Sequence, residues 1–158
     1  MSTRSYIAIK TNSGKYLTAY CHWDGYLSYV GAVLQKYYTN PIRVFRLIQS
    51  GDMSKLAPRI CPAEDSTHNF DHPDKDVCVF YGRDRGEQET EPRYLTKEKL
   101  LDPQAWIEYV YIFDPDSQTW EYAELKYRKD NDANYFSELR PLAPAVEAYI
   151  DDVDKYFE

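Results

Sequence analysis

The densest group of chemically reactive side chains lies at residues 20–26, which read Tyr-Cys-His-Trp-Asp-Gly-Tyr. Cysteine, histidine and aspartate are the residue types that a thiol nucleophile and its base require. Successive residues on a strand point to opposite faces, so Cys21 and His22 cannot form the hydrogen bond that activates a thiolate. His22 and Asp24 can share a face and act as an oriented base or bind a ligand. The structural alternative is that His22 lies at a strand edge and Asp24 caps the following helix.

A second polar cluster follows the apolar run 77–81, which predicts a central strand buried on both faces. Residues 81–87 read Tyr-Gly-Arg-Asp-Arg-Gly-Glu, which predicts a glycine-bounded loop at the end of that strand. Its arginines can hold a phosphate or carboxylate through paired N–H donors, or its charges can pair with one another in a turn. If the two clusters converge, they form one pocket for a small anionic ligand. The candidate binding residues are then His22, Asp24, Arg83, Asp84, Arg85 and Glu87.

His68 and His72 are four residues apart, with acidic residues and a cysteine nearby, and these are residue types that bind zinc. A histidine pair at this spacing binds a metal best on a helix, where both rings share a face. The prolines, the asparagine and the acidic residues of segment 57–76 predict a long loop instead. We therefore expect no metal site and no other cofactor.

The composition favours recognition of a protein over recognition of nucleic acid. The 158 residues include 26 acidic and 19 basic side chains, and the net charge of −7 disfavours binding to phosphate backbones and anionic membranes. Aromatic residues make up 16% of the chain, and 16 residues are tyrosines. Tyrosine combines an apolar ring with a polar hydroxyl and suits recognition surfaces. The alternative is that many of the tyrosines are half-buried strand residues.

The cysteines and the apolar runs bear on the compartment. Three irregularly spaced cysteines do not indicate a disulfide framework. The first residues, Met-Ser-Thr-Arg-Ser, lack the apolar run of a signal peptide, and no segment approaches the roughly 18 apolar residues that a membrane span needs. We therefore expect a protein of the cytoplasm that has no membrane partner.

Two hairpins and three main helices are expected to position the polar clusters. Strand-forming runs at 6–10 and 16–21 flank an Asn-Ser-Gly turn, and runs at 107–113 and 119–125 flank Asp-Pro-Asp-Ser. Apolar residues at helical spacing predict a first helix at about 27–38.

A second helix begins at Asn40, which can cap the free amides ahead of a proline in the first turn, and it ends before Gly51. Pro141 opens a last helix whose apolar stripe should dock on the sheet or on a second subunit. Together these elements predict one α+β domain over residues 1–158, with a mostly antiparallel sheet of about five strands.

The motifs at 20–26 and 81–87, together with the Ser-Gly-Asp-Met-Ser that follows the helix pair at 50–54, resemble a family of small uncharacterised proteins from phages, prophages and related mobile elements. The resemblance covers roughly residues 4–125. It implies a phage or mobile-element context and transfers no catalytic residue.

The first functional expectation is a non-enzymatic accessory protein that binds and inhibits a host or defence protein in the host cytoplasm, through an acidic, tyrosine-rich surface. A homodimer through the C-terminal helix is a further expectation. The alternative is a small-ligand or nucleotide-binding protein, with enzymatic activity left open, that uses a pocket formed by His22, Asp24, Arg83 and Arg85.

Overall fold

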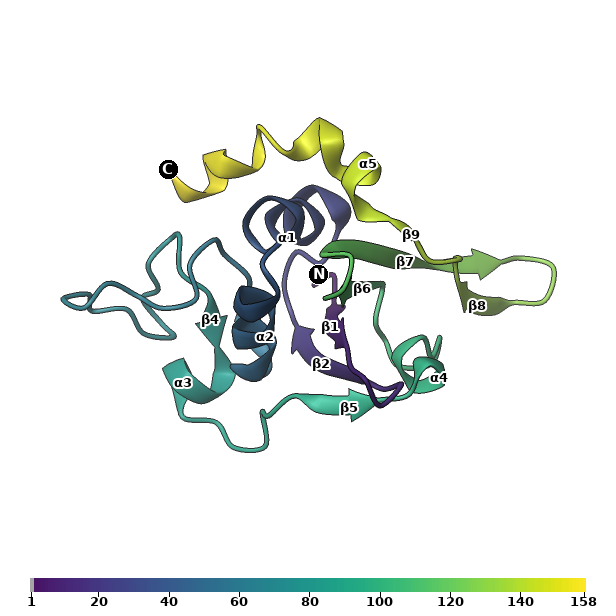
Figure 1. Ribbon diagram of the computed structural model, residues 1–158, viewed down its shortest axis with the longest axis horizontal. Helices are drawn as coiled ribbons and strands as arrows, with labels where there is room; N and C mark the ends of the chain where they lie inside the picture. The colour runs from purple at the N-terminus through teal and green to yellow at the C-terminus, as the bar shows by residue number, and fades with distance from the viewer. Residues whose placement is uncertain (1) are drawn as a thin grey trace.

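Two hairpins joined by a parallel pair of strands form the centre of the sheet (Figure 1). β1 (Ser5–Lys10) pairs antiparallel with β2 (Tyr16–Cys21), and β6 (Tyr109–Asp114) pairs antiparallel with β7 (Thr119–Arg128). β1 and β6 then pair in parallel. This computed structural model describes residues 2–158, and it confirms both expected hairpins.

Five shorter strands extend this centre. β3 (Met53–Lys55) pairs in parallel with β2, and β4 (Val79–Phe80) pairs antiparallel with β3. β5 (Arg93–Leu95) pairs with β2, while β8 (Ala133–Phe136) and β9 (Arg140–Pro141) pair with β7. Within residues 2–158 the sheet therefore has nine strands, in the order β4-β3-β2-β1-β6-β7-β8, with β5 and β9 beside this path.

The α+β class is confirmed for this single domain, but the expected sheet of about five mostly antiparallel strands is wrong. The sheet is mixed, because β1 pairs in parallel with β6 and β2 with β3. It is also larger, because it includes strands of only two to four residues. Strands this short show no periodicity in the sequence. Parallel pairs join segments that are far apart in the chain, so no local pattern predicts them either.

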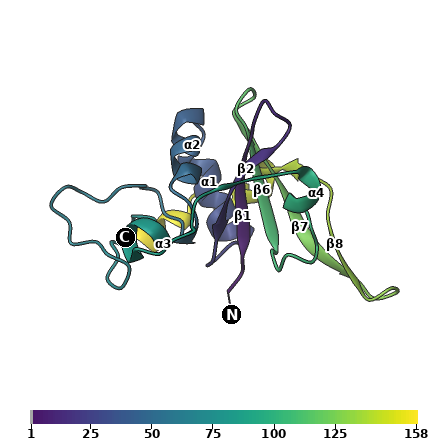
Figure 2. The ribbon, with the colours of Figure 1, turned by 90° about the horizontal axis from the view of Figure 1, so that it is seen from below.

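The helices cover the two faces of the sheet unequally (Figure 2). A π-helical turn (Leu27–Gly31) runs into α1 (Ala32–Tyr37), and α2 (Pro41–Gln49) follows on the same face. The Asn40 side chain accepts hydrogen bonds from the first amides of α2, which confirms the expected cap. α4 (Lys97–Leu100) lies on the opposite face. In the part of the chain that the structure describes, no helix combines the length and apolar character needed to cross a membrane.

Alternation along β1 and β2 sends side chains into two apolar clusters. Ile7, Ile9 and Cys21 belong to the larger cluster, with the residues of α1 and α2, whereas Ala8 and Tyr16 belong to a smaller one, with the buried Leu100 of α4. The two central strands are therefore buried on both faces, which leaves functional side chains only at strand ends and in connections.

The expected central strand at 77–81 is wrong. β4 has two residues and lies at the edge of the sheet, and the chain turns at once into α3 (Tyr81–Arg85). The apolar run is buried because Cys78 packs beneath irregular chain: its thiol lies 3.2 Å from the amide of Ala57 and 3.6 Å from the hydroxyl of Tyr38. Burial by loops and burial by neighbouring strands leave the same apolar pattern in a sequence.

The C-terminal segment forms three short helical turns in place of the one expected helix. α5 (Leu142–Val146) is followed by 3₁₀ turns at Glu147–Tyr149 and Val153–Phe157. The segment crosses above α1 (Figure 1), and α5 contacts both α1 and the π-helical turn. Val146 and Val153 are buried there, so the apolar stripe of the segment docks on its own chain.

Gly51 decides how closely the segment after α3 approaches the sheet. It has a φ of +90°, and a Cβ at this position would lie 2.3 Å from the carbonyl oxygen of Thr90. The amide of Asp52 donates a 2.8 Å hydrogen bond to the same oxygen. The absent side chain therefore lets the chain pass close enough to bring Arg93 to the sheet.

We expect Gly51→Ala to lower the free energy of unfolding by about 3 kcal/mol or more, because it combines left-handed strain with a backbone clash. Gly14→Ala is the matched control: Gly14 has a φ of +82° but nothing within 4 Å of its added Cβ. It should cost only about 1–2 kcal/mol. Chemical denaturation of both variants measures the difference, and equal losses would contradict the close approach of Thr90.

Candidate functional site

His22 lies where β2 leaves the sheet, and its ring is held from two sides. The Tyr20 hydroxyl and Nδ1 of His22 form a 2.6 Å hydrogen bond, and the ring meets that of Trp23 edge-on, with 4.6 Å between centroids. Burial, followed by the positive charge of Arg4, lowers the pKa of His22. A neutral imidazole that is hydrogen-bonded to a phenol can make a neutral hydrogen bond to a ligand, but it cannot form an ion pair with one.

Cys21 is separated from His22, as the alternation along the strand predicts. Its side chain is fully buried in the larger cluster, and burial raises the pKa of the thiol to about 12. Thiolate chemistry at neutral pH therefore has no support at this position.

Asp24 stabilises the turn of the chain that follows β2. Its φ is 57°, and its carboxylate accepts a 2.9 Å hydrogen bond from the Tyr26 hydroxyl. The first turn of the following helix has no side-chain cap, so the expected capping role of Asp24 is wrong. The amide of Gly25 donates to the Thr3 carbonyl at 2.8 Å, and this contact fixes the corner against the chain that precedes β1.

Arg83 is held by the fold. The segment expected to be a loop is largely α3, and the Arg83 guanidinium donates to the Asp84 carboxylate and to the carbonyls of Ile60 and Cys78. Binding an anion here would require breaking these bonds. The arginine instead ties the loop at residue 60 to the start of α3.

Asp84 forms an ion pair with Arg83, and only 5% of the Asp84 side chain is exposed. It accepts a 2.8 Å hydrogen bond from the Phe80 amide and lies 3.3 Å from Nε2 of His68. Nδ1 of His68 accepts from the Asp74 amide at 2.9 Å, so the ring proton lies on Nε2. Burial raises the pKa of the Asp84 carboxyl, but the hydrogen bonds from Arg83 and from the Phe80 amide outweigh it and hold the pKa below its usual value.

The two remaining residues of the second cluster are exposed. The Arg85 guanidinium lies over the rings of Phe70 and Tyr81, at 5.0 and 5.9 Å, and 3.9 Å from the carboxylate of Glu87. A cavity of about 640 Å³ adjoins Arg85 and includes His72. Across residues 2–158, no group of three or more histidine, cysteine or acidic side chains is placed to hold a metal.

The structure does not bring the two predicted clusters into one cavity. Cys21 and Phe80 both pair with Met53, but β2 is parallel to β3 and β4 is antiparallel to it, so the chain runs in opposite directions from Cys21 to His22 and from Phe80 into α3. The cavity beside Arg85 contains neither His22 nor Asp24. Two cations from elsewhere in the chain line a cavity with Tyr20, the first residue of the 20–26 cluster.

Those cations are Arg4 and Arg93, and no sequence motif indicated them. Arg93 donates to the Asp52 carboxylate at 2.6 Å, and the other oxygen of Asp52 accepts from the Tyr20 amide at 3.0 Å. These groups line a cavity of about 390 Å³ together with Tyr6 and Trp106. Burial raises the pKa of the Asp52 carboxyl. The hydrogen bond from the Tyr20 amide and the charge of Arg93 oppose this rise.

A second cavity, of about 460 Å³, adjoins the first. Arg4 and Trp106 line both cavities, and Glu108 lines the second. We call the two together the Arg4–Trp106 groove. Its residues come from the chain before β1, from β1, β2, β5, β7 and β8, and from the connections before β3 and β6, so the pairing of strands that are far apart in the chain assembles it.

Comparison with known proteins adds no assignment: no protein-family model, curated protein or solved structure matches this chain.

We expect Asp84→Asn to lower the free energy of unfolding by about 2 kcal/mol at neutral pH, since it removes the charge that Arg83 and His68 face. Because the folded pKa is depressed, the stabilisation is complete above the unfolded pKa of about 4 and is lost as the pH falls through the folded value. The gap between wild type and variant should therefore shrink below about pH 4. Urea denaturation across this range measures it.

Asp76→Asn is the control, because Asp76 forms a 3.5 Å salt bridge with Arg59 in which both side chains are more than 40% exposed. Its effect should stay within about 1 kcal/mol at every pH. A gap for Asp84→Asn that does not change with pH would overturn the ion-pair interpretation.

Proposed function

We propose that the protein binds and inhibits a host or defence protein of a phage or mobile-element system, in a role that requires no catalysis. The recognition surface is the C-terminal surface, residues 147–158, and its partner presents a basic face. The phage context is supported by the resemblance of the motifs at 20–26 and 81–87.

The single observation that carries this proposal is the joint exposure of tyrosines and acidic groups on that surface. Tyr149 is 39% and Tyr156 54% exposed, and both line a cavity of about 320 Å³ with Asp152 and Lys155. The twelve-residue surface has five acidic residues and one lysine. Aromatic anchors beside a surplus of negative charge are suited to a partner of opposite charge.

The surface is held in place before any partner arrives. Lys36 donates to the carbonyl of Ile150 at 3.1 Å and to the carboxylate of Asp154 at 2.6 Å, and the Tyr37 hydroxyl donates to the same carboxylate. The ring of Tyr156 packs edge-on against buried Tyr29, with 5.2 Å between centroids. Such anchoring reduces the entropy lost on binding. Two copies meeting here would place like charges together, which disfavours a homodimer through this surface.

The test is capture of host proteins on the immobilised chain, identification of the bound partner, and calorimetry with that partner purified. We expect the double variant Asp151→Lys, Asp152→Lys to weaken binding about tenfold or more, because it reverses charge where the partner docks. Wild-type affinity should fall as salt concentration rises.

Glu64→Lys with Asp65→Lys is the matched control: both residues are exposed in the loop 57–76, and the change in net charge is the same. It should leave the affinity within about threefold of wild type at physiological salt, where distant charges are screened. A folded chain that captures no partner, or a control that loses as much affinity as the C-terminal variant, would overturn the proposal.

A further inference from the structure

A strained, exposed tryptophan marks the Arg4–Trp106 groove. Trp106 has a φ of 65°, and 78% of its surface is exposed. A bulky residue rarely adopts this region, and it persists there only where the surrounding structure imposes it. The chain is anchored on both sides: the Ala105 amide donates to the Asp102 carbonyl at 3.2 Å, and the Glu108 amide donates to the Arg4 carbonyl at 2.9 Å. The indole is thus presented to solvent by a fold that gains no core packing from it.

Arg4 supplies the groove with a cation that the fold does not use. Within residues 2–158 its guanidinium donates no hydrogen bond and forms no salt bridge, although the side chain is half-buried. Arg43 and Arg83, by contrast, donate to main-chain carbonyls. An arginine that lines two cavities without a partner is available to an anion.

Arg93 provides a second cation in the smaller cavity. It gives one nitrogen to Asp52, and 45% of its side chain is exposed. Tyr6 and Tyr20 line the same cavity, and the Tyr6 hydroxyl can donate to a ligand, whereas the Tyr20 hydroxyl is bonded to His22. Two arginines against one carboxylate make this cavity positive in a chain whose net charge is −7.

We infer that the Arg4–Trp106 groove binds a small molecule in which a phosphate or carboxylate group is attached to a planar ring system. The anionic group lies between Arg4 and Arg93, and the ring stacks on Trp106. The two cavities, of about 390 and 460 Å³, have the size of small-molecule sites. The groove is separate from the C-terminal surface, so either proposal can fail while the other stands.

Isothermal titration calorimetry of the full chain tests the ligand class with four probes. AMP joins a ring to a phosphate, and indole-3-acetate joins a ring to a carboxylate, whereas adenosine and inorganic phosphate each supply only one part. At least one of the first two should bind about tenfold or more tightly than adenosine and phosphate. The tighter of the two identifies the anionic group.

Two variants then locate the binding. Arg4→Gln should weaken the probe about 10- to 100-fold, because a charged hydrogen bond is lost. Trp106→Gly should weaken it similarly without lowering the thermal midpoint, because relief of the positive-φ strain offsets the entropy that glycine adds to the unfolded chain. Loss of a purely structural tryptophan would lower the thermal midpoint.

The controls are Trp23→Ala and Arg46→Gln, which remove an exposed tryptophan and an arginine that line neither cavity. Both should bind the probe as wild type does. The inference is overturned if neither AMP nor indole-3-acetate binds at millimolar concentration. It is also overturned if phosphate alone binds as well as AMP, or if the controls lose as much affinity as the groove variants.

Discussion

Buried hydrogen bonds from aromatic side chains to main-chain carbonyls hold the irregular parts of this protein on its sheet. A carbonyl buried outside a strand ladder needs a donor, and an unsatisfied one costs about 1–3 kcal/mol. Here phenols and an indole from the core supply the donors. The bonds join Tyr29 to Leu56, Tyr38 to Ala57, Tyr111 to Gly25 and Trp120 to Tyr38, at 2.6, 2.6, 2.7 and 2.7 Å. Leu56 and Ala57 lie in the connection that follows β3, and Gly25 lies at the corner that follows β2, so these bonds hold both segments against the core.

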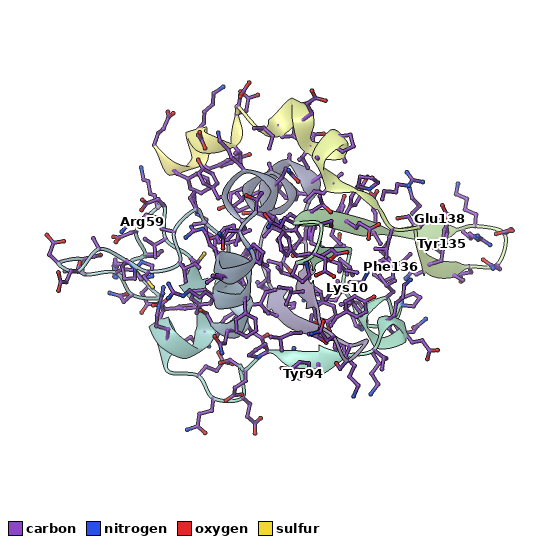
Figure 3. The ribbon with its side chains drawn as sticks, viewed as in Figure 1. Lys10, Arg59, Tyr94, Tyr135, Phe136 and Glu138 are labelled. Carbon is purple, nitrogen blue, oxygen red and sulfur yellow. The ribbon has the colours of Figure 1, made fainter. Side chains whose placement is uncertain are left out.

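The aromatic excess therefore divides into two populations with different physical roles. Tyr29, Tyr38 and Tyr111 are buried donors. Other tyrosines lie at the rim: Tyr94 is 62% exposed on β5, and Tyr135 lies on the projecting β7–β8 hairpin (Figure 3). Tyr29 links the populations, because its hydroxyl holds Leu56 while its ring supports the exposed Tyr156. Composition predicts that tyrosines matter, but only the fold separates donors from recognition residues.

The sequence predicted what is locally encoded and missed what is assembled over distance. The two hairpins and the Asn40-capped helix are confirmed, because turn and cap residues act within a few positions. Arg83 and Asp84 were expected to form a binding site, because polar residues at a strand end often do. In the structure, Arg83 instead donates to the carbonyls of Ile60 and Cys78, and Asp84 contacts His68. No sequence motif marks the Arg4–Trp106 groove, because no two of its charged residues are neighbours in the sequence.

The sheet also keeps the two candidate surfaces apart. The C-terminal surface packs on the α1 side, and the groove opens on the face that carries α4, where Tyr6 and Tyr20 belong to the smaller cluster. Ligands that share no residue and bind opposite faces of a rigid layer affect each other only through a change in that layer. The Tyr111 hydroxyl, on a central strand, fixes the corner beside His22 through a buried 2.7 Å hydrogen bond to the Gly25 carbonyl. Because the strands between the two surfaces are buried on both faces, the proposed partner protein and the proposed small ligand should bind independently of each other.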